Sequence, residues 1–153
     1  MEKENFSVIV PVFNSNDTIE KTLSCLLPFS EKGIKVFISD NFSSDNTRKK
    51  LIKYQKVKNF EIIFQDRNYG IKNFIFLLNK VDTKWVLPIG SDDYLINAEI
   101  VIEEFNKLLK NTTNVGMSFN SKFIYENNLV SDKCNLPLIG SEFIRFKNFY
   151  IHS

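Results

Sequence analysis

The chain has 153 residues and a mass of 17.9 kDa, which suits one domain and is too short for two domains of ordinary size. Hydrophobic residues make up 43% of it and charged residues 25%, the balance of a soluble globular protein. A net charge of +2, from 20 basic and 18 acidic residues, excludes a polyelectrolyte surface. The charge therefore gives no reason to expect a nucleic acid as partner.

The two cysteines, Cys25 and Cys134, are too few and too far apart for a disulfide framework or a zinc cluster. We therefore expect reduced thiols and a cytoplasmic protein. No N-terminal stretch has the basic, apolar and small-residue order of a signal peptide, and no apolar run approaches the ~20 residues that span a bilayer. Peripheral association with the inner face of a membrane is left open.

Segments with strand character alternate with segments of helical periodicity. The first strand, expected at residues 7–13, is a continuous apolar run of the kind found in strands covered on both faces. The next segment keeps one helical face through Ile19, Leu23 and Leu26, and Pro28 is expected to end it. Further strands are expected at residues 35–40, 60–65 and 85–89, and further helices at 47–56, around 71–78 and around 101–109.

This alternation predicts an α/β fold with a mostly parallel central sheet, flanked by helices and connected by right-handed crossovers. In the third helix, Ile71, Phe74, Ile75 and Leu78 are expected to form the buried face. After Asn111 the pattern changes: residues 115–125 and 129–132 read as two strands joined by a turn at 127–128. They predict a small antiparallel element at the edge of the sheet, within a single domain of residues 1–153.

Four polar clusters follow the expected strands, at residues 14–17, 40–47, 66–70 and 90–94. The carboxyl ends of strands in an open parallel sheet are where ligands bind. Helix capping is the alternative for residues 14–17 and the favoured interpretation for Asp45. For Asn68 and Gly70 the favoured interpretation is a turn into the next helix. Asp40, at the tip of a central strand, is placed where such folds hold a ribose or a base.

The sequence contains no glycine-rich phosphate loop of the dinucleotide-binding or Walker type. The charge of a bound diphosphate must then be met in another way. The adjacent acids Asp92 and Asp93 would repel each other when unpaired, and a Mg²⁺ or Mn²⁺ ion would remove that repulsion and bridge to phosphate oxygens. Gly90 and Ser91 leave room for a ligand beside the backbone. The alternative is a solvated turn that caps a helix near Asn97.

In their order along the chain, four short motifs resemble family 2 glycosyltransferases of the GT-A fold. The stretch VPVFN at 10–14 is similar to the family's opening motif, and DNFSSDNT at 40–47 is similar to its next acidic segment. NYG at 68–70 and SDD at 91–93 resemble its N-x-G and metal-binding D-x-D motifs. The resemblance covers about residues 5–110. It implies a Rossmann-like GT-A fold and a metal-dependent enzyme that transfers a sugar from a nucleoside diphosphate to a hydroxyl acceptor.

The resemblance also implies roles for individual residues. Pro11, Phe13 and Asp40 would recognise the nucleobase, usually uracil, with Phe13 stacking on it. Asp92 would contact the ribose or the metal, and Asp93 would bind the Mn²⁺ or Mg²⁺ ion that bridges the diphosphate. The full set of implied nucleotide-binding positions is Pro11, Val12, Phe13, Asn14, Asp40, Asn68, Gly70, Ser91 and Asp92, and the implied metal ligands are Asp93 and Asp92.

Two departures from the family pattern limit what the resemblance implies. Gly90 stands where many relatives carry an additional acid, so the metal site depends on Asp92 and Asp93. Relatives also continue beyond 153 residues, and their later part supplies the acceptor site and the general base. No catalytic base is identified here, since Glu126, Asp132 and Glu142 match none. We expect a nucleoside-diphosphate sugar as donor and a saccharide or lipid-linked glycan as acceptor.

Three functions remain open at this point. The first is an inverting glycosyltransferase of polysaccharide or glycolipid synthesis. The second is a truncated or degenerate domain that binds a nucleotide-sugar without transferring it. The third is a nucleotidyltransferase with a similar metal site, which is disfavoured because no basic glycine-rich loop follows the first strand.

Overall fold

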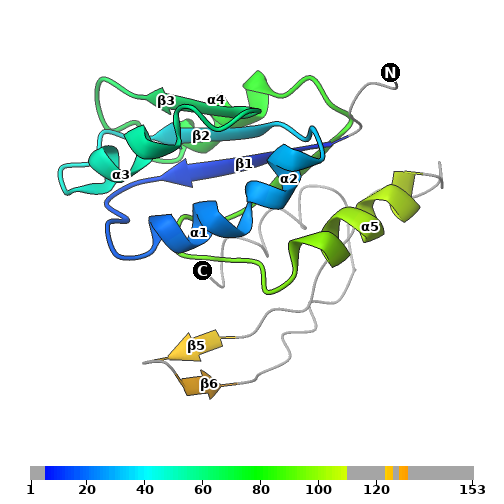
Figure 1. The fold of residues 1–153 in the computed structure, drawn as a ribbon. Helices are drawn as coiled ribbons and strands as arrows, with labels where there is room; N and C mark the ends of the chain where they lie inside the picture. The colour runs from blue at the N-terminus through cyan, green and yellow to red at the C-terminus, as the bar shows by residue number, and fades with distance from the viewer. Residues whose placement is uncertain (1–5, 110–122, 126–127, 131–153) are drawn as a thin grey trace. The chain divides into compact units, whose positions relative to one another are not determined.

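The computed structural model describes residues 6–109, 123–125 and 128–130 of the chain. Its main feature is a sheet of four strands in the order β3-β2-β1-β4, in which every neighbouring pair is parallel (Figure 1). The strands are β1 (Phe6–Val12), β2 (Val36–Asp40), β3 (Phe60–Phe64) and β4 (Trp85–Pro88). The predicted parallel sheet is confirmed, with each strand within one or two residues of its expected place.

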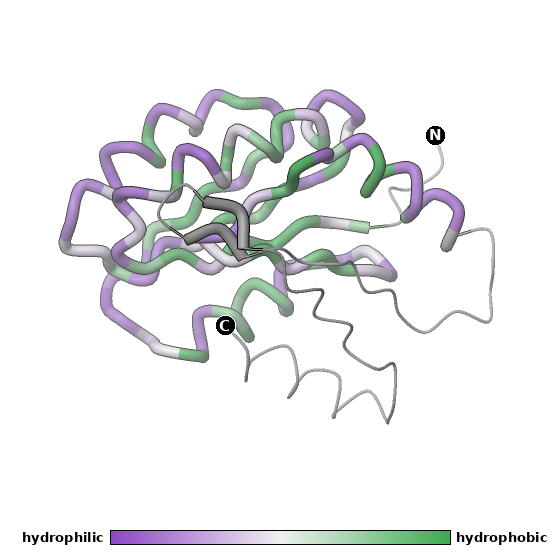
Figure 2. The backbone as a smooth tube through the Cα atoms, turned by 90° about the horizontal axis from the view of Figure 1, so that it is seen from below, coloured by the Kyte–Doolittle hydropathy of each residue, from purple (hydrophilic) through white to green (hydrophobic). Residues whose placement is uncertain are grey.

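The two central strands are buried on both faces, as their continuous apolar sequence predicts. Val8, Ile9 and Val10 of β1 are fully inaccessible to solvent, and all five residues of β2 are buried. Figure 2 shows the hydrophobic stretches gathered in the strands and the hydrophilic ones along outer helices and loops. Burial of this apolar surface is the main stabilising contribution to the fold.

The helices follow the strands in the expected alternation: α1 (Ile19–Cys25), α2 (Leu27–Glu31), α3 (Thr47–Tyr54), α4 (Lys72–Lys80) and α5 (Ala98–Leu109). Helix α4 lies on the opposite side of the sheet from α1 and α2 (Figure 1). It packs Phe74 and Leu77 against Ile9 and Phe37 of the two central strands. Helices thus cover both faces of the sheet and leave the carboxyl ends of the strands to the loops.

Two details of the helices differ from the prediction. Pro28 does not end the first helix, which already ends at Cys25; it lies in the first turn of α2, where its missing N–H leaves no bond unmade. The expected face of α4 is confirmed for Phe74 and Leu78, which pack in or against the core, and is wrong for Ile71 and Ile75, which are 57% and 48% exposed.

The buried face of α4 includes Asn73, which is 2% exposed. Its amide donates to the carbonyl of Ser39 at 2.9 Å and accepts from the Ser39 hydroxyl at 2.6 Å. A buried amide needs such partners, and β2 supplies them only in this rotation of the helix. A polar contact between distant residues therefore sets which apolar side chains of α4 reach the core.

The expected antiparallel pair is present as β5 (Phe123–Tyr125) and β6 (Asn128–Val130), with Phe123 opposite Val130 and Tyr125 opposite Asn128. Asn128, expected in the turn, belongs to the second strand. The chain divides into compact units at 1–112 and 113–153, and this pair lies in the second. Its position at the edge of the sheet and the single domain of 1–153 stay predictions. Residues 115–122, Cys134 and 142–153 lie outside the described residues.

Candidate functional site

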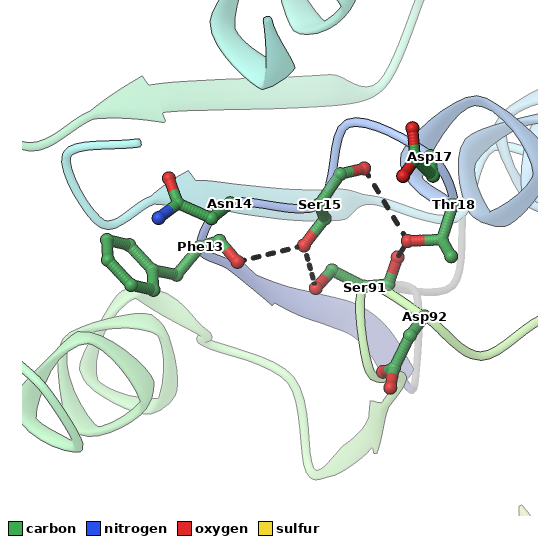
Figure 3. Close-up of a pocket in the computed structure, with 7 residues that line it drawn as sticks. All are labelled: Phe13, Asn14, Ser15, Asp17, Thr18, Ser91 and Asp92. Carbon is green, nitrogen blue, oxygen red and sulfur yellow. Dashed lines mark hydrogen bonds between the residues drawn. The ribbon is translucent and has the colours of Figure 1, made fainter. Parts of the chain in front are cut away.

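The candidate site lies at the carboxyl ends of β1 and β4. Strand order reverses beside β1, with β2 and β3 on one side and β4 on the other, and ligands of such sheets bind at this point. The loops that leave β1 and β4 enclose an open pocket of about 360 Å³. Its lining consists of Phe13, Asn14, Ser15, Asp17, Thr18, Ser91 and Asp92, all drawn in Figure 3.

The loop after β1 is held by the loop after β2. Asn14 has a positive φ of 47°, and its side-chain oxygen accepts a hydrogen bond from the backbone amide of Ser44 at 2.9 Å. The backbone amide of Asn14 donates to the Ser43 hydroxyl at 2.8 Å. Thr18 directly precedes α1 as its N-cap residue, and no side chain makes a capping hydrogen bond there. Capping as the alternative role for residues 14–17 is therefore wrong.

Asp45 has the capping role that the sequence favours, together with a second one. One carboxylate oxygen accepts from the amide of Thr47 at the start of α3, at 2.9 Å, and the other accepts from the amide of Asn16 at 3.0 Å. These hydrogen bonds lower the pKa of Asp45 against the opposing effect of burial, which is the largest single influence on it. Asp45 thus joins the start of a helix to the loop that forms the pocket.

The loop after β4 brings two carboxylates together over a glycine. A Cβ atom on Gly90 would lie 2.7 Å from Oδ2 of Asp93 and 2.9 Å from Oδ1 of Asp92, distances that real Cβ atoms do not show. Burial, and then the charge of Asp92, raise the pKa of the Asp93 carboxyl above its usual value. Two acidic oxygens that converge on one point in this way fit a divalent cation, which prefers oxygen ligands.

Asp92 and Asp93 are exposed in a turn, as the alternative interpretation expects, but neither of them caps α5. The side chain that accepts from the first turn of α5 is that of Asn97, which lies 3.2 Å from the amide of Ile100. Within the described residues, no group of three or more acidic, histidine or cysteine side chains could hold a metal. The protein therefore offers Asp92 and Asp93 as a pair, and remaining ligands would come from phosphate and water.

Asp40 is completely buried at the end of β2 and does not line the pocket. Its Oδ2 accepts from the guanidinium Nε of Arg48 at 2.5 Å and from the amide of Ser43 at 3.2 Å. Its Oδ1 is the one buried side-chain nitrogen or oxygen without a hydrogen-bond partner in the described part of the chain. An unpartnered buried acceptor is costly, which marks Oδ1 as a position for a ligand donor.

Arg48 was not singled out from the sequence, although it is the ion-pair partner of Asp40. Besides the ion pair, its Nη2 donates to the carbonyl of Gln65 at 2.5 Å. Its guanidinium also lies 5.4 Å from the ring centres of both Phe42 and Phe64. The guanidinium group therefore contacts the ends of β2 and β3 and the loops that follow them. These contacts keep the Asp40 carboxylate in one orientation.

Asn68 and Gly70 form the turn that the sequence favours. The side-chain oxygen of Asn68 accepts from the amide of Gly70 and from the side-chain amide of Asn41, both at 2.8 Å. Gly70 has a φ of +55°, which a side chain would strain. Neither residue lines the pocket, and the side chain of Val12 is buried in the core at 1% exposure.

The structure thus brings Phe13, Asn14, Ser91 and Asp92 together in one pocket, with Asp93 beside them. Outside its lining are Pro11 and Val12 at the end of β1, Asp40 at the end of β2, and Asn68 and Gly70 in the loop after β3. Ser15, Asp17 and Thr18 line the pocket although they were not named as site residues. Ser15 and Asp17 lie inside a polar cluster noted in the sequence, whereas nothing in the sequence distinguishes Thr18.

Comparison with known proteins identifies the family of the chain. A sequence profile described as Glycosyl transferase family 2 matches residues 7–149. The chain is 29% identical over 102 residues to WfaP of Escherichia coli, a UDP-Glc:alpha-D-GlcNAc-diphosphoundecaprenol beta-1,3-glucosyltransferase. This match covers 63% of the chain and 39% of WfaP, so the chain spans well under half the length of that relative.

Solved structures give the same picture. TarS 1–349 of S. aureus in complex with UDP-GlcNAc superposes with a TM-score of 0.62 and 30% identity, over 70% of this chain and 32% of that one. A mannosyltransferase of Pyrobaculum calidifontis, solved with GDP-Man and Mn²⁺, has a TM-score of 0.61 over 71% of this chain and 33% of its own. At 17% identity it shows the fold alone. The predicted GT-A type of α/β fold is confirmed.

Proposed function

Because the chain belongs to glycosyl transferase family 2, we propose that it binds a nucleoside-diphosphate sugar and transfers the sugar to a hydroxyl acceptor. The observation that carries the proposal is the pocket between the β1 and β4 loops. Two carboxylates converge at its edge, at the point of the sheet where nucleotides bind. UDP is the proposed nucleotide, since TarS, at 30% identity, has been solved with UDP and with UDP-GlcNAc.

Asp92 and Asp93 are the proposed ligands of a Mn²⁺ or Mg²⁺ ion. The convergence of their oxygens over Gly90 supports this, because the space that a Cβ would fill is free for the acids and their ligand. Such an ion is typically held by one or two carboxylates together with substrate phosphates. It would stabilise the negative charge that develops on the departing nucleoside diphosphate.

The nucleobase is proposed to lie between Phe13 and Asp40. The ring of Phe13 is 46% exposed and lines the pocket, which suits stacking on a base. Oδ1 of Asp40 is an acceptor that lacks a donor, and the imide N–H of uracil is a donor of the required kind. Because Asp40 is fully buried, the base would reach it only after a local adjustment of the loops around it.

Pro11, Asn14 and Ser91 complete the proposed contacts of the nucleotide, while Asn68 and Gly70 support the loop beside them. Val12 contributes through its backbone, since its carbonyl accepts from the amide of Asn41 at 2.7 Å. The general base belongs to no described residue that the geometry singles out.

The acceptor is proposed to be a saccharide or a lipid-linked glycan in polysaccharide or glycolipid synthesis. This rests on WfaP, whose name describes a diphosphoundecaprenol-linked acceptor. No described helix is long and apolar enough to cross a membrane. A peripheral position at the cytoplasmic face of a membrane would bring a UDP-sugar and a lipid-linked acceptor together.

The proposal is tested by calorimetric titration with UDP, GDP, CDP and ADP, each with and without Mn²⁺. We expect UDP to bind most tightly and Mn²⁺ to strengthen its binding, with Asp93→Ala abolishing the effect of the metal. Asp82→Ala is the matched control, because that acid lies in the α4–β4 loop away from the pocket. Metal-independent binding of UDP, or binding unchanged by Asp93→Ala, would contradict the assignment of the donor site.

Hydrolysis of the bound nucleotide-sugar separates an enzyme from a domain that only binds. Release of free sugar from UDP-GlcNAc or UDP-Glc in the presence of Mn²⁺ supports the transferase, because water then takes the place of the acceptor hydroxyl. Binding without any release of sugar favours the non-catalytic alternative.

A further inference from the structure

Two threonine hydroxyls, one on the residue just before α1 and one within α1, contact the backbone of the loop that carries the paired acids. Oγ1 of Thr18 lies 2.8 Å from the carbonyl oxygen of Ser91. Oγ1 of Thr22 lies 2.7 Å from the carbonyl oxygen of Asp93 and 3.0 Å from that of Ser91. Figure 3 shows the contact of Thr18 with Ser91 beneath the pocket. The carbonyls on either side of Asp92 thus both accept hydrogen bonds from α1 and its N-cap residue.

The spacing of the two threonines explains why their hydroxyls can bind both carbonyls. Residues four apart lie one above the other on a helix face, about 5–6 Å apart. Thr22 is 1% exposed, so its hydroxyl must find its partner inside the protein. The carbonyl of Asp93 is the nearest acceptor in reach, whereas the carbonyl of Thr18 lies 3.5 Å away.

The same loop has other contacts with α1, since Nζ of Lys21 lies 3.7 Å from the ring centre of Tyr94 and Sγ of Cys25 accepts from the amide of Leu95 at 3.2 Å. The turn of this loop is closed by one hydrogen bond, from the amide of Asp93 to the carbonyl of Gly90 at 3.1 Å. The hydroxyl of Ser91 is 2.6 Å from that of Ser15 in the pocket-lining loop. The threonine hydroxyls hold the carbonyls of residues 91 and 93. In this backbone conformation the carboxylates of Asp92 and Asp93 converge over Gly90.

We propose that Thr18 and Thr22 are positioning residues for the divalent-cation site, which they shape by holding the backbone on both sides of Asp92. The inference rests on the proposed function, because it takes Asp92 and Asp93 as the metal ligands. Outer-shell groups that orient metal ligands typically contribute 10–100-fold to metal affinity. The two hydroxyls act one step further out, through the backbone, so we expect the lower end of this range.

The test measures the affinity for Mn²⁺ at a fixed concentration of UDP, with electron paramagnetic resonance reporting the free ion. Four proteins are compared: the wild type, Thr22→Val, Thr22→Ser and Thr83→Val. Thr22→Val removes the hydroxyl and keeps the shape, while Thr22→Ser keeps the hydroxyl and removes the methyl group. Thr83→Val is the matched control, because the Thr83 hydroxyl also donates to a backbone carbonyl, that of Trp85, at the other end of β4. We expect about ten-fold weaker Mn²⁺ binding in Thr22→Val alone, and unchanged affinity for UDP without metal.

Two results would overturn the inference. One is a Thr22→Val protein with the Mn²⁺ affinity of the wild type. The other is an equal loss of metal-free UDP binding, which would show a general collapse of the pocket. If Thr22→Val does not fold, Thr22→Ala takes its place, since it removes the hydroxyl and puts no methyl group beside the two carbonyls. A wild-type protein that binds UDP but no Mn²⁺ would refute the metal site of the proposed function, a result distinct from either of these.

Discussion

Replacing Arg48 by alanine provides a strong test of how the base-binding end of the site is built. Asp40 is 0% exposed at its side chain, and Arg48, 35% exposed, is its ion-pair partner. Removing one partner of a buried pair leaves an uncompensated charge and costs about 3–5 kcal/mol when both are fully buried. Arg48 is partly reached by water, and the amide of Ser43 still donates to the same carboxylate oxygen.

We therefore expect Arg48→Ala to lower the free energy of unfolding by about 2–3 kcal/mol, below the range for a fully buried pair. This corresponds to a melting temperature lower by roughly 4–12 °C for a chain of this length. Urea denaturation gives the free energy and thermal unfolding gives the midpoint. Arg67→Ala is the control, because Arg67 is exposed, lies over the ring of Tyr69 and makes no ion pair with any described residue. We expect a change of about 0.5 kcal/mol or less for it.

A double-mutant cycle identifies the charge as the cause. Asp40→Asn keeps the shape of the side chain and removes the charge, so Arg48→Ala should cost about 1–2 kcal/mol less in that background than in the wild type. A loss below about 1 kcal/mol for Arg48→Ala, or an identical loss in both backgrounds, would refute the reasoning that Arg48 compensates a buried carboxylate.

Three further predictions concern the pocket. Gly90→Ala should bind Mn²⁺ roughly 10–100-fold more weakly while its stability changes by less than about 1 kcal/mol, because only the ends of the Asp92 and Asp93 side chains must move; calorimetry and urea denaturation measure the two effects, and unchanged metal affinity would contradict the convergence of the acids. Phe13→Ala should weaken UDP binding by about 1–3 kcal/mol, whereas Phe13→Tyr should retain it, as fluorescence titration would show. Asp93→Asn should stabilise the metal-free protein at neutral pH. The pKa of Asp93 is raised in the folded state, so the wild type loses stability as the pH rises from the pKa of the unfolded chain through the pKa of the folded protein. Thermal unfolding measured against pH without metal would refute this if the stabilities of the two proteins changed in parallel.

The sequence by itself determined the order of the elements and the places of the acids. Continuous apolar runs such as that of β1 and helical periodicities such as that of α5 are local properties, so they can be read without knowing what they pack against. The positions of Asp40 at the end of a strand and of Asp93 in the loop after a strand followed from the same pattern. Because parallel strands end at one edge of a sheet, these acids were expected on the side where ligands bind.

Only the tertiary structure decided which of these residues meet. The strand order places the β1 and β4 loops together, so Phe13 and Asp92 share a pocket although 78 residues separate them. The burial of Asp40 and its pairing with Arg48, the rotation of α4 around Asn73, and the threonine hydroxyls on the acidic loop depend on contacts between distant segments. Hydropathy and local spacing carry no information on such contacts, because a polar side chain shows its partner only after the chain has folded.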